Sequence, residues 1–179
     1  AFMAYWHAYH DEDTVAWHQK NATEFNIPVA GEQVHVEHYQ AQKSNKLVVF
    51  CSGLELYSKM LVSIAQKFSD LGFDVAIFDP PGEGLSTGKR NHFTMNEVTK
   101  SIHHVIDGFK SQYDQIFLVG ISLGGAQAYY AGSSHEGVSA ISVINLFEFT
   151  SKQLENLFYQ KTELLNYQQL LPLLSKIIP

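Results

Sequence analysis

Four short apolar runs set the order of elements along the chain. They are KLVVFCSG (46–53), FDVAIFD (73–79), QIFLVGI (115–121) and GVSAISVINLF (137–147), and each has the length of a strand. Uninterrupted apolar runs of this length are typical of strands that are buried on both faces of a sheet. The pattern therefore predicts a sheet that is covered by helices.

Helical patterns fill the intervals between these runs. Residues 57–71 carry apolar side chains at helical spacing. Thr94 is followed three residues later by Glu97, which is the pattern of a capping box, and an apolar helical face comes next. A further helix begins at about Ser122. Strands that alternate with helices in this way predict an α/β fold with a parallel, doubly wound sheet.

The two ends of the chain differ from this alternation. Residues 24–40 predict an antiparallel hairpin that turns at Gly31 and joins the start of the sheet. The last 30 residues are rich in leucine at helical spacing, which is more helix than a crossover needs. We therefore divide the chain into an N-terminal extension (1–23), the front part of an α/β core (24–149) and a helical segment that begins a lid (150–179).

Composition narrows the classes of function. The 179 residues are 45% hydrophobic and 17% charged, as in an ordinary soluble globular domain. The net charge of −6 comes without a basic stripe, so no nucleic-acid partner is expected. Every apolar stretch is of strand length, so no membrane span is expected.

The single cysteine, Cys51, excludes an internal disulfide and favours a reducing compartment, the cytoplasm. The sequence predicts no cofactor and no metal site. His7, His10, Asp11 and Asp13 have a spacing that suggests metal ligands, but an exposed terminal segment explains them better.

The strongest chemical signal is Ser122 in the stretch VGISLGG, where the third apolar run passes into a helix. In parallel sheets, ligands bind beyond the carboxyl ends of the strands, which is where this serine falls. A sharp turn from strand to helix needs small neighbours, and Gly120, Gly124 and Gly125 supply them. The free N–H groups at a helix start favour the negative charge that develops on a carbonyl oxygen. The pattern predicts a serine nucleophile.

The order of hairpin, VVFCSGL, helix, GFDVAIFDPPGEGLSTG, helix and VGISLGG resembles the α/β-hydrolase family over residues 24–149. It is most similar to the branch of lysophospholipases and monoacylglycerol lipases. The resemblance implies an oxyanion hole made by the backbone N–H groups of Leu54 and Leu123. Two positions depart from the family pattern, because Ser52 and Glu83 stand where histidines are usual.

Asp79 begins the second of these motifs, DPPGEGLS. Prolines and glycines fix the direction of such a loop, and a carboxylate at its start can accept hydrogen bonds from the backbone. We therefore expect a structural role for Asp79.

A serine nucleophile needs a base, and the base needs a carboxylate to orient it. In the α/β-hydrolase fold these follow the serine in the order acid, then histidine. Only His135 follows Ser122, in a loop expected at the opposite edge of the sheet. His92 is the one internal substitute for the base, and Glu148 is the candidate acid. The usual acid and base are expected beyond Pro179.

The other histidines of the hairpin and of the helix that starts after Thr94 are expected to be solvated or hydrogen-bonded; they are His35, His38, His103 and His104. Apolar residues of the strand at 138–145 would be left at an open sheet edge if the chain ended here. We therefore expect residues 1–179 to be the front part of a longer hydrolase. An open edge of this kind can also pair two copies in a homo-oligomer.

These observations predict a serine hydrolase that cleaves a carboxylic ester or thioester through an acyl-enzyme on Ser122. The leucine-rich segment at 151–179 would shape an apolar acyl pocket, so the expected partner is a small lipid-like or aryl acyl ester. Two alternatives stay open. The chain could belong to a non-catalytic protein that has kept the fold and lost the base, or to an acyltransferase on the same fold.

Overall fold

The computed structural model describes residues 10–40, 43–90 and 92–144. The helices and strands in chain order are α2 (Glu12–Asn21), β1 (Ala22–Val29), β2 (Glu32–Tyr39), β3 (Lys46–Cys51), the 3-10 turn η1 (Ser58–Met60), α3 (Val62–Asp70), β4 (Asp74–Phe78), α4 (Met95–Phe109), β5 (Gln115–Ile121), α5 (Leu123–Ser133) and β6 (Ala140–Ile144).

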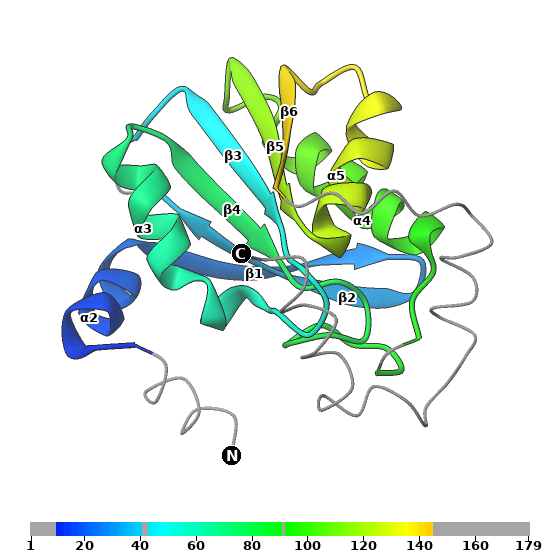
Figure 1. The fold of residues 1–179 in the computed structure, drawn as a ribbon, viewed down its shortest axis with the longest axis horizontal. Helices are drawn as coiled ribbons and strands as arrows, with labels where there is room; N and C mark the ends of the chain where they lie inside the picture. Colours follow the sequence, from blue (N-terminus) through cyan, green and yellow to red (C-terminus); the bar gives the residue numbers. More distant parts are fainter. Residues whose placement is uncertain (1–9, 41–42, 91, 145–179) are drawn as a thin grey trace, which may run out of the picture. The chain divides into compact units, whose positions relative to one another are not determined.

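The strands of the described part form one six-stranded sheet in the order β1-β2-β4-β3-β5-β6 (Figure 1). β4, β3, β5 and β6 are parallel, whereas β2 is antiparallel to both β1 and β4. The hairpin turns at Ala30 and Gly31, which both have positive φ, as its tight two-residue turn requires. The predicted, mostly parallel sheet and its N-terminal antiparallel hairpin are thus confirmed.

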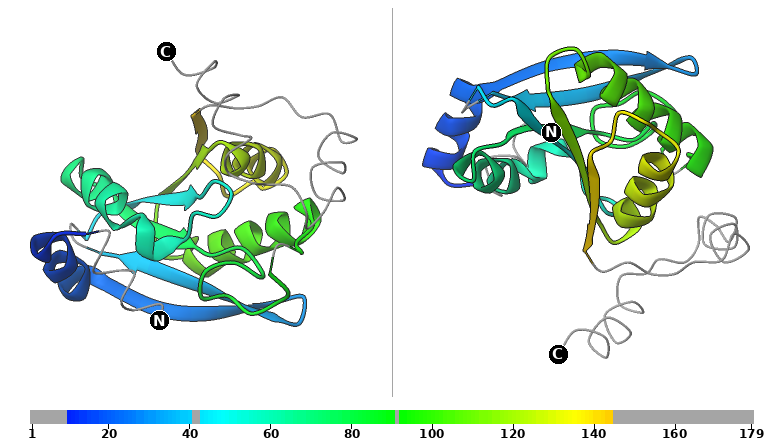
Figure 2. Two further views of the ribbon diagram at one scale, coloured as in Figure 1. Left: turned by 60° about the horizontal axis from the view of Figure 1, so that its bottom comes forward. Right: turned by 90° about the horizontal axis from the view of Figure 1, so that it is seen from above.

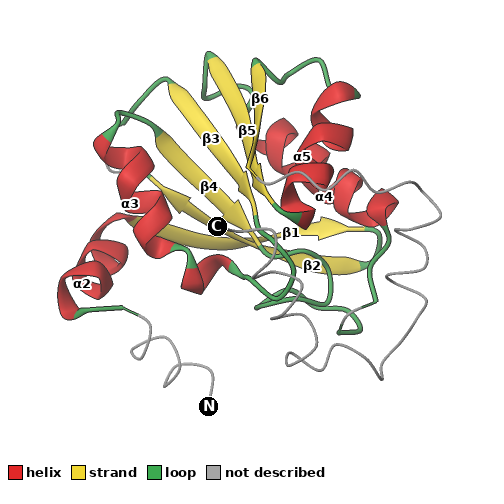
Figure 3. Ribbon diagram, in the orientation of Figure 1, coloured by secondary structure: helices red, strands yellow, loops and turns green. Residues whose placement is uncertain are grey.

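Helices cover both faces of the sheet (Figures 2 and 3). α3 lies on one face with α2 beside it, and α4 and α5 lie on the other. Because side chains alternate along a strand, β3 sends Val48 and Phe50 into the core under α3 and its other apolar residues toward the opposite face. All five residues of β3 from Leu47 to Cys51 are therefore at most 2% exposed.

α4 begins as its sequence pattern predicts. The Thr94 hydroxyl accepts a hydrogen bond from the Glu97 N–H at 3.2 Å, and the Glu97 carboxylate accepts one from the Thr94 N–H at 2.7 Å. Together these bonds satisfy two donors that a helix start would otherwise leave without partners.

Three elements differ from the sequence-based expectation. The helix predicted over 57–71 is broken into η1 and α3, because Ser58 and Lys59 turn inward to buried carboxylates. α2 was not predicted, since its buried residues include Thr14 and His18 and its apolar pattern is weak. β6 is not buried on both faces, because Ala140, Ser142 and Ile144 are exposed on the side away from α5.

The helical segment expected at 150–179 lies outside the described residues. Within the described ranges, no helix is both long and apolar enough to cross a membrane.

Candidate active site

Ser122 occupies the turn between the carboxyl end of β5 and the first residue of α5. Its φ of 55° and ψ of −122° place a non-glycine residue in a region that costs about 1–3 kcal/mol. Its N–H donates to the carbonyl oxygen of Ile144 at 2.9 Å, so the end of β6 holds the turn from the side. Strain of this kind persists only where the surrounding structure over-determines it.

Two glycines allow α5 to start this close to the sheet. A Cβ added to Gly124 would overlap the carbonyl oxygens of Cys51 and Ser52 at the end of β3. One added to Gly120 would overlap the backbone of Gly124 in turn. Backbone atoms cannot move aside without disturbing the sheet, so the close crossing requires glycine at both positions.

A second turn lies beside Ser122. The Leu56 N–H donates to the Gly53 carbonyl at 3.2 Å, with Leu54 and Glu55 as the central residues. Glu55 has a φ of 59°, so this turn also holds a non-glycine residue in the left-handed region. A Cβ on Gly53 would lie 3.6 Å from the Cβ of Ser122, which fixes the two turns as direct neighbours.

The expected oxyanion donors belong to these two turns. Leu54 follows Gly53 directly, and Leu123 is the first residue of α5. The first N–H groups of a helix have no acceptor within that helix, and the helix dipole places partial positive charge there. An arrangement of this kind can stabilise negative charge on an oxygen bound next to the Ser122 hydroxyl.

Asp79 connects the loops around this edge. Its carboxylate is fully buried and accepts hydrogen bonds from the backbone N–H groups of Ser58 at 2.7 Å and of Leu85 at 2.9 Å. Burial raises the pKa of Asp79, although these two N–H groups act in the opposite direction. Its structural role is as expected from the motif. Glu83, in the same loop, is 6% exposed.

The candidate base and acid are not brought to Ser122 within the described ranges. His92 is exposed, and its backbone N–H donates to the Lys89 carbonyl at 3.1 Å. Glu148 lies outside the described residues. His135 packs against His103 with ring centroids 4.9 Å apart, and its Nε2 lies 3.5 Å from an Asp107 oxygen. Within the described ranges, the backbone N–H of Ser122 donates to Ile144 and its carbonyl accepts from Gly125.

Of the N-terminal residues with the spacing of metal ligands, Asp11 and His10 make hydrogen bonds within the protein. Asp11 is the N-cap of α2 and accepts a hydrogen bond from the Thr14 N–H at 2.8 Å. The His10 Nε2 donates to the Lys59 carbonyl at 2.8 Å. His7 lies outside the described residues.

Sequence reasoning missed a buried cluster of ionisable side chains at β2. It comprises the basic side chains of His18, His35 and Lys59, each of which lies within 3.9 Å of both Glu24 and Glu37. All of these side chains are buried except that of Glu24, which is 43% exposed. One signal was present in the sequence, because β2 has ionisable residues within a strand that lies between β1 and β4. The partners come from segments far apart in the chain, and no local pattern identifies them.

The mostly parallel sheet, with a turn of positive φ at Ser122 between the carboxyl end of β5 and α5, is typical of the α/β-hydrolase fold class. The sequence model of the family described as serine aminopeptidase, S33, matches residues 42–165. This match covers more than half of the chain, so the chain belongs to that family of α/β hydrolases. The expected family is confirmed, and the lysophospholipase-like branch stays a prediction.

Relatives and solved structures agree with the family. An acyl transferase of Photobacterium phosphoreum is 32% identical over 113 residues, which are 60% of this chain and 37% of that protein. The α/β hydrolase GrgF from Penicillium sp. sh18 superimposes with a TM-score of 0.65 at 20% identity, over 70% of this chain and 46% of the other. Est1E from Butyrivibrio proteoclasticus, solved with ferulic acid, gives a TM-score of 0.60 at 19% identity, over 65% of this chain and 50% of that one.

This chain therefore spans little more than a third of the curated relative and about half of the solved structures. At such low identities, the likeness to the solved structures concerns the fold alone.

Proposed function

We propose that the protein is a serine hydrolase that cleaves a carboxylic ester or thioester with a lipid-like or small acyl group. The observation that carries this proposal is the strained Ser122 turn, with the Gly53 to Leu56 turn directly beside it. Two strained non-glycine residues, Ser122 and Glu55, thus flank one point at the carboxyl edge of the sheet. Stored strain of this kind clusters at functional sites.

In the proposed reaction, the Ser122 hydroxyl oxygen attacks the carbonyl carbon of the ester and gives up its proton to a base. The N–H groups of Leu54 and Leu123 stabilise the negative oxygen of the tetrahedral intermediate. The carbon–oxygen or carbon–sulfur bond then breaks, and the leaving alcohol or thiol takes the proton. Water attacks the resulting acyl-enzyme in the same manner and releases the carboxylic acid.

The base and its orienting carboxylate are proposed to come from outside the described residues, as the order of the catalytic groups in this fold requires. His92 and Glu148 stay as alternatives within the chain.

Exposed apolar side chains at the same edge support an apolar acyl group. Leu54, Leu85 and Ile144 are 36%, 41% and 46% exposed. Leu54 belongs to the turn beside Ser122, Ile144 accepts the Ser122 N–H, and Leu85 is tied through Asp79 to the loop that follows Leu54. Apolar surface at a candidate site favours ligands with an apolar part.

Acyl transfer is the second candidate function, and the relative named as an acyl transferase favours it. The chemistry up to the acyl-enzyme is the same. The difference lies in the second step, where an alcohol or thiol in place of water takes the acyl group.

Labelling with a fluorophosphonate probe tests the proposal in the natural full-length protein. We expect labelling of the wild type and none of Ser122→Ala, together with a fall in ester cleavage of at least about 10³-fold. Ser133→Ala, in the same helix, is the matched control and should label normally. Equal labelling of Ser122→Ala and the wild type would disprove the nucleophile. The partition of the acyl group between water and an added alcohol or thiol then separates hydrolysis from acyl transfer.

A further inference from the structure

The buried cluster of ionisable residues surrounds one cation, the ammonium group of Lys59. The Lys59 Nζ lies 2.9 Å from Glu37 Oε1, 2.5 Å from Glu24 Oε1 and 3.3 Å from His18 Nε2. His18 and His35 also approach the Glu37 carboxylate, at 3.2 and 3.5 Å. Glu37 has no exposed surface, and Lys59 is 7% exposed. The lysine is therefore buried between a carboxylate without exposed surface, Glu37, and one that is 43% exposed, Glu24.

The charges in this cluster depend on one another. Burial alone would raise the pKa of Glu37, but hydrogen bonds from His18 and His35 and the charge of Lys59 outweigh it and hold the pKa well below its usual value. The Tyr39 hydroxyl also donates to Glu37. An ionised carboxylate without exposed surface is costly unless it is paired, so Lys59 is the countercharge that Glu37 requires.

Lys59 is attached to the candidate site through a short segment. It belongs to η1, five residues after Leu54. Its neighbour Ser58 donates its N–H to Asp79 Oδ1, and the carbonyl of Lys59 accepts a hydrogen bond from His10 Nε2. Two consecutive residues are thus fastened to two buried carboxylates, one on β2 and one at the end of β4. The turn that holds Leu54 lies between this double attachment and the end of β3.

We propose that Lys59 is a positioning residue: its ammonium group, held by Glu37 and Glu24, fixes the place of the turn whose Leu54 N–H faces the reacting oxygen. The inference rests on the proposed function, because it assigns Leu54 a part in the reaction. An oxyanion donor must lie within about 2.7–3.1 Å of the oxygen, and a misplacement of about 1 Å can cost about 10²-fold in rate. Glu55, strained in the same turn, needs an attachment of this kind to keep its conformation.

The alternative interpretation of these residues is a metal-binding site. His18, Glu24 and Glu37 offer ligand atoms within 4.8 Å of one another. The Lys59 ammonium, however, lies within 3.3 Å of all three side chains, where it supplies the positive charge that a metal ion would bring. A second cation would be repelled by the first.

Lys59→Met in the natural full-length protein tests the proposal, with Lys67→Met on the exposed face of α3 as the matched control. We expect Lys59→Met to lower kcat for ester cleavage by about 10- to 100-fold and to leave KM within about twofold. Lys67→Met should change neither. An unchanged kcat, or a loss that appears mainly in KM, would overturn the proposal.

Two further variants guard against simple misfolding. Lys59→Met with Glu37→Gln removes both members of the ion pair, so no buried charge is left without a partner. This double variant should fold and keep the low kcat, whereas full activity would contradict a positioning role. In Lys59→Ala, added ethylammonium should restore part of kcat without altering KM, and absence of rescue would count against the ammonium group.

Two measurements separate the remaining outcomes. Tight binding of Co²⁺ or Zn²⁺ to the wild type, abolished by Glu37→Gln, would replace the proposal with a metal site. If Ser122→Ala is active, the proposed function fails. If Ser122→Ala is inactive and Lys59→Met is normal, only the positioning role fails.

Discussion

The two edges of the sheet both hold polar groups in buried or half-buried places, but they are built in opposite ways. At the carboxyl edge, Ser122 and Glu55 have strained backbones, and the carboxylate of Asp79 holds loops together. At the amino edge, the His38 Nε2 lies 2.6 Å from the Tyr113 hydroxyl, which donates to Asp74 Oδ2 at 3.0 Å. None of these three residues has positive φ.

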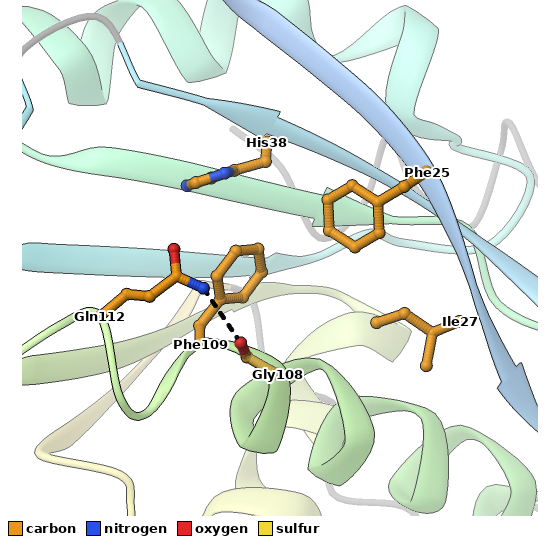
Figure 4. Close-up of a pocket in the computed structure, with 6 residues that line it drawn as sticks. All are labelled: Phe25, Ile27, His38, Gly108, Phe109 and Gln112. Atoms are coloured by element: carbon orange, nitrogen blue, oxygen red, sulfur yellow. Dashed lines mark hydrogen bonds between the residues drawn. The ribbon is translucent and has the colours of Figure 1, made fainter.

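The amino-edge array resembles a catalytic relay by composition alone. His38 lines a groove of about 260 Å³ between β1 and the end of α4, together with Phe25, Ile27, Gly108, Phe109 and Gln112 (Figure 4). Burial lowers the pKa of His38 to about 4, although the charge of Asp74 opposes the shift. His38, Tyr113 and Asp74 are each at most 7% exposed, and the rings of His38 and Tyr113 both pack against Phe109.

The contrast separates two uses of hydrogen bonds. A histidine, a hydroxyl and a carboxylate in a row stabilise a fold when all are buried and relaxed. A reactive group needs an accessible place and a geometry that the rest of the structure enforces, which is what the turn at Ser122 provides. Substitutions at the amino edge should therefore change stability and leave the proposed chemistry at Ser122 unaffected, whereas substitutions at the carboxyl edge can change both.

The largest effect is expected for Gly124→Ala at the carboxyl edge. The new Cβ would meet backbone oxygens of β3, so we expect a loss of about 3 kcal/mol or more in the free energy of unfolding, measured in urea. Gly125→Ala is the matched control, because its Cβ would overlap only a side chain, Val143 at 2.5 Å, and would lie at ordinary contact distance from the Gly120 backbone, at 3.4 Å. Its loss of stability should be smaller, since no backbone atom has to move. Equal losses for the two variants would mean that the crossing of α5 over β3 is looser than described.

The next effect is a pH dependence that arises at the amino edge. Unfolded His38 takes up a proton below about pH 6.5, whereas folded His38 resists protonation down to about pH 4. Its contribution to stability is therefore complete above pH 6.5 and is lost as the pH falls toward 4, by up to about 3 kcal/mol. In urea unfolding between pH 4 and 7, the free energy of unfolding of His38→Gln should depend less steeply on pH than that of the wild type. His104→Gln, at an exposed position, should keep the full pH dependence of the free energy of unfolding. A wild-type pH dependence in His38→Gln would show that His38 is not its source.

Tyr113→Phe should cost about 1–3 kcal/mol of stability, because it removes the hydroxyl that joins His38 to the buried Asp74. Fluorophosphonate labelling of Ser122 should be unchanged, since the two edges lie at opposite ends of the strands. Tyr129→Phe, on the exposed side of α5, should change the free energy of unfolding by less than about 0.5 kcal/mol. Slower labelling in Tyr113→Phe at full stability would instead connect the amino edge to the chemistry.

The smallest effect is expected for Gly108→Ala, at the rim of the amino-edge groove. No atom lies within 4 Å of the added Cβ, and alanine favours a helix over glycine by about 0.5–1 kcal/mol, so stability should rise by about this amount. Gly72→Ala is the matched control, because it also has open space but a φ of 88°. It should lose about 1 kcal/mol. A stability gain in both variants would show that backbone conformation does not decide the outcome.

Local patterns in the sequence predicted most of the fold. The apolar runs gave four of the strands, Thr94 and Glu97 gave the start of α4, and the stretch VGISLGG placed Ser122 between β5 and α5. Each of these signals is short in range, because burial, capping and sharp turns depend on residues within a few positions of one another. β6 was the exception, since exposure of a strand depends on which element lies beside it.

Strand order decided the rest. Glu37 and Lys59 meet because β2 lies next to β4 and η1 follows β3, and α2 brings His18 to the same place. From the sequence, His35 and His38 were expected to be solvated or hydrogen-bonded, and in the structure both are buried and have polar partners. The sequence around each of these residues does not identify its partner in the folded protein.

The sequence by itself thus determined the family, the order of the strands along the chain and the place of Ser122. Only the tertiary structure decided how the turn of Leu54 comes to lie against Ser122, and that Glu37 and Lys59 meet as a buried ion pair. The physical reason is that apolar periodicity is a property of one contiguous segment. An ion pair or a close backbone crossing, by contrast, forms only between segments that folding brings together.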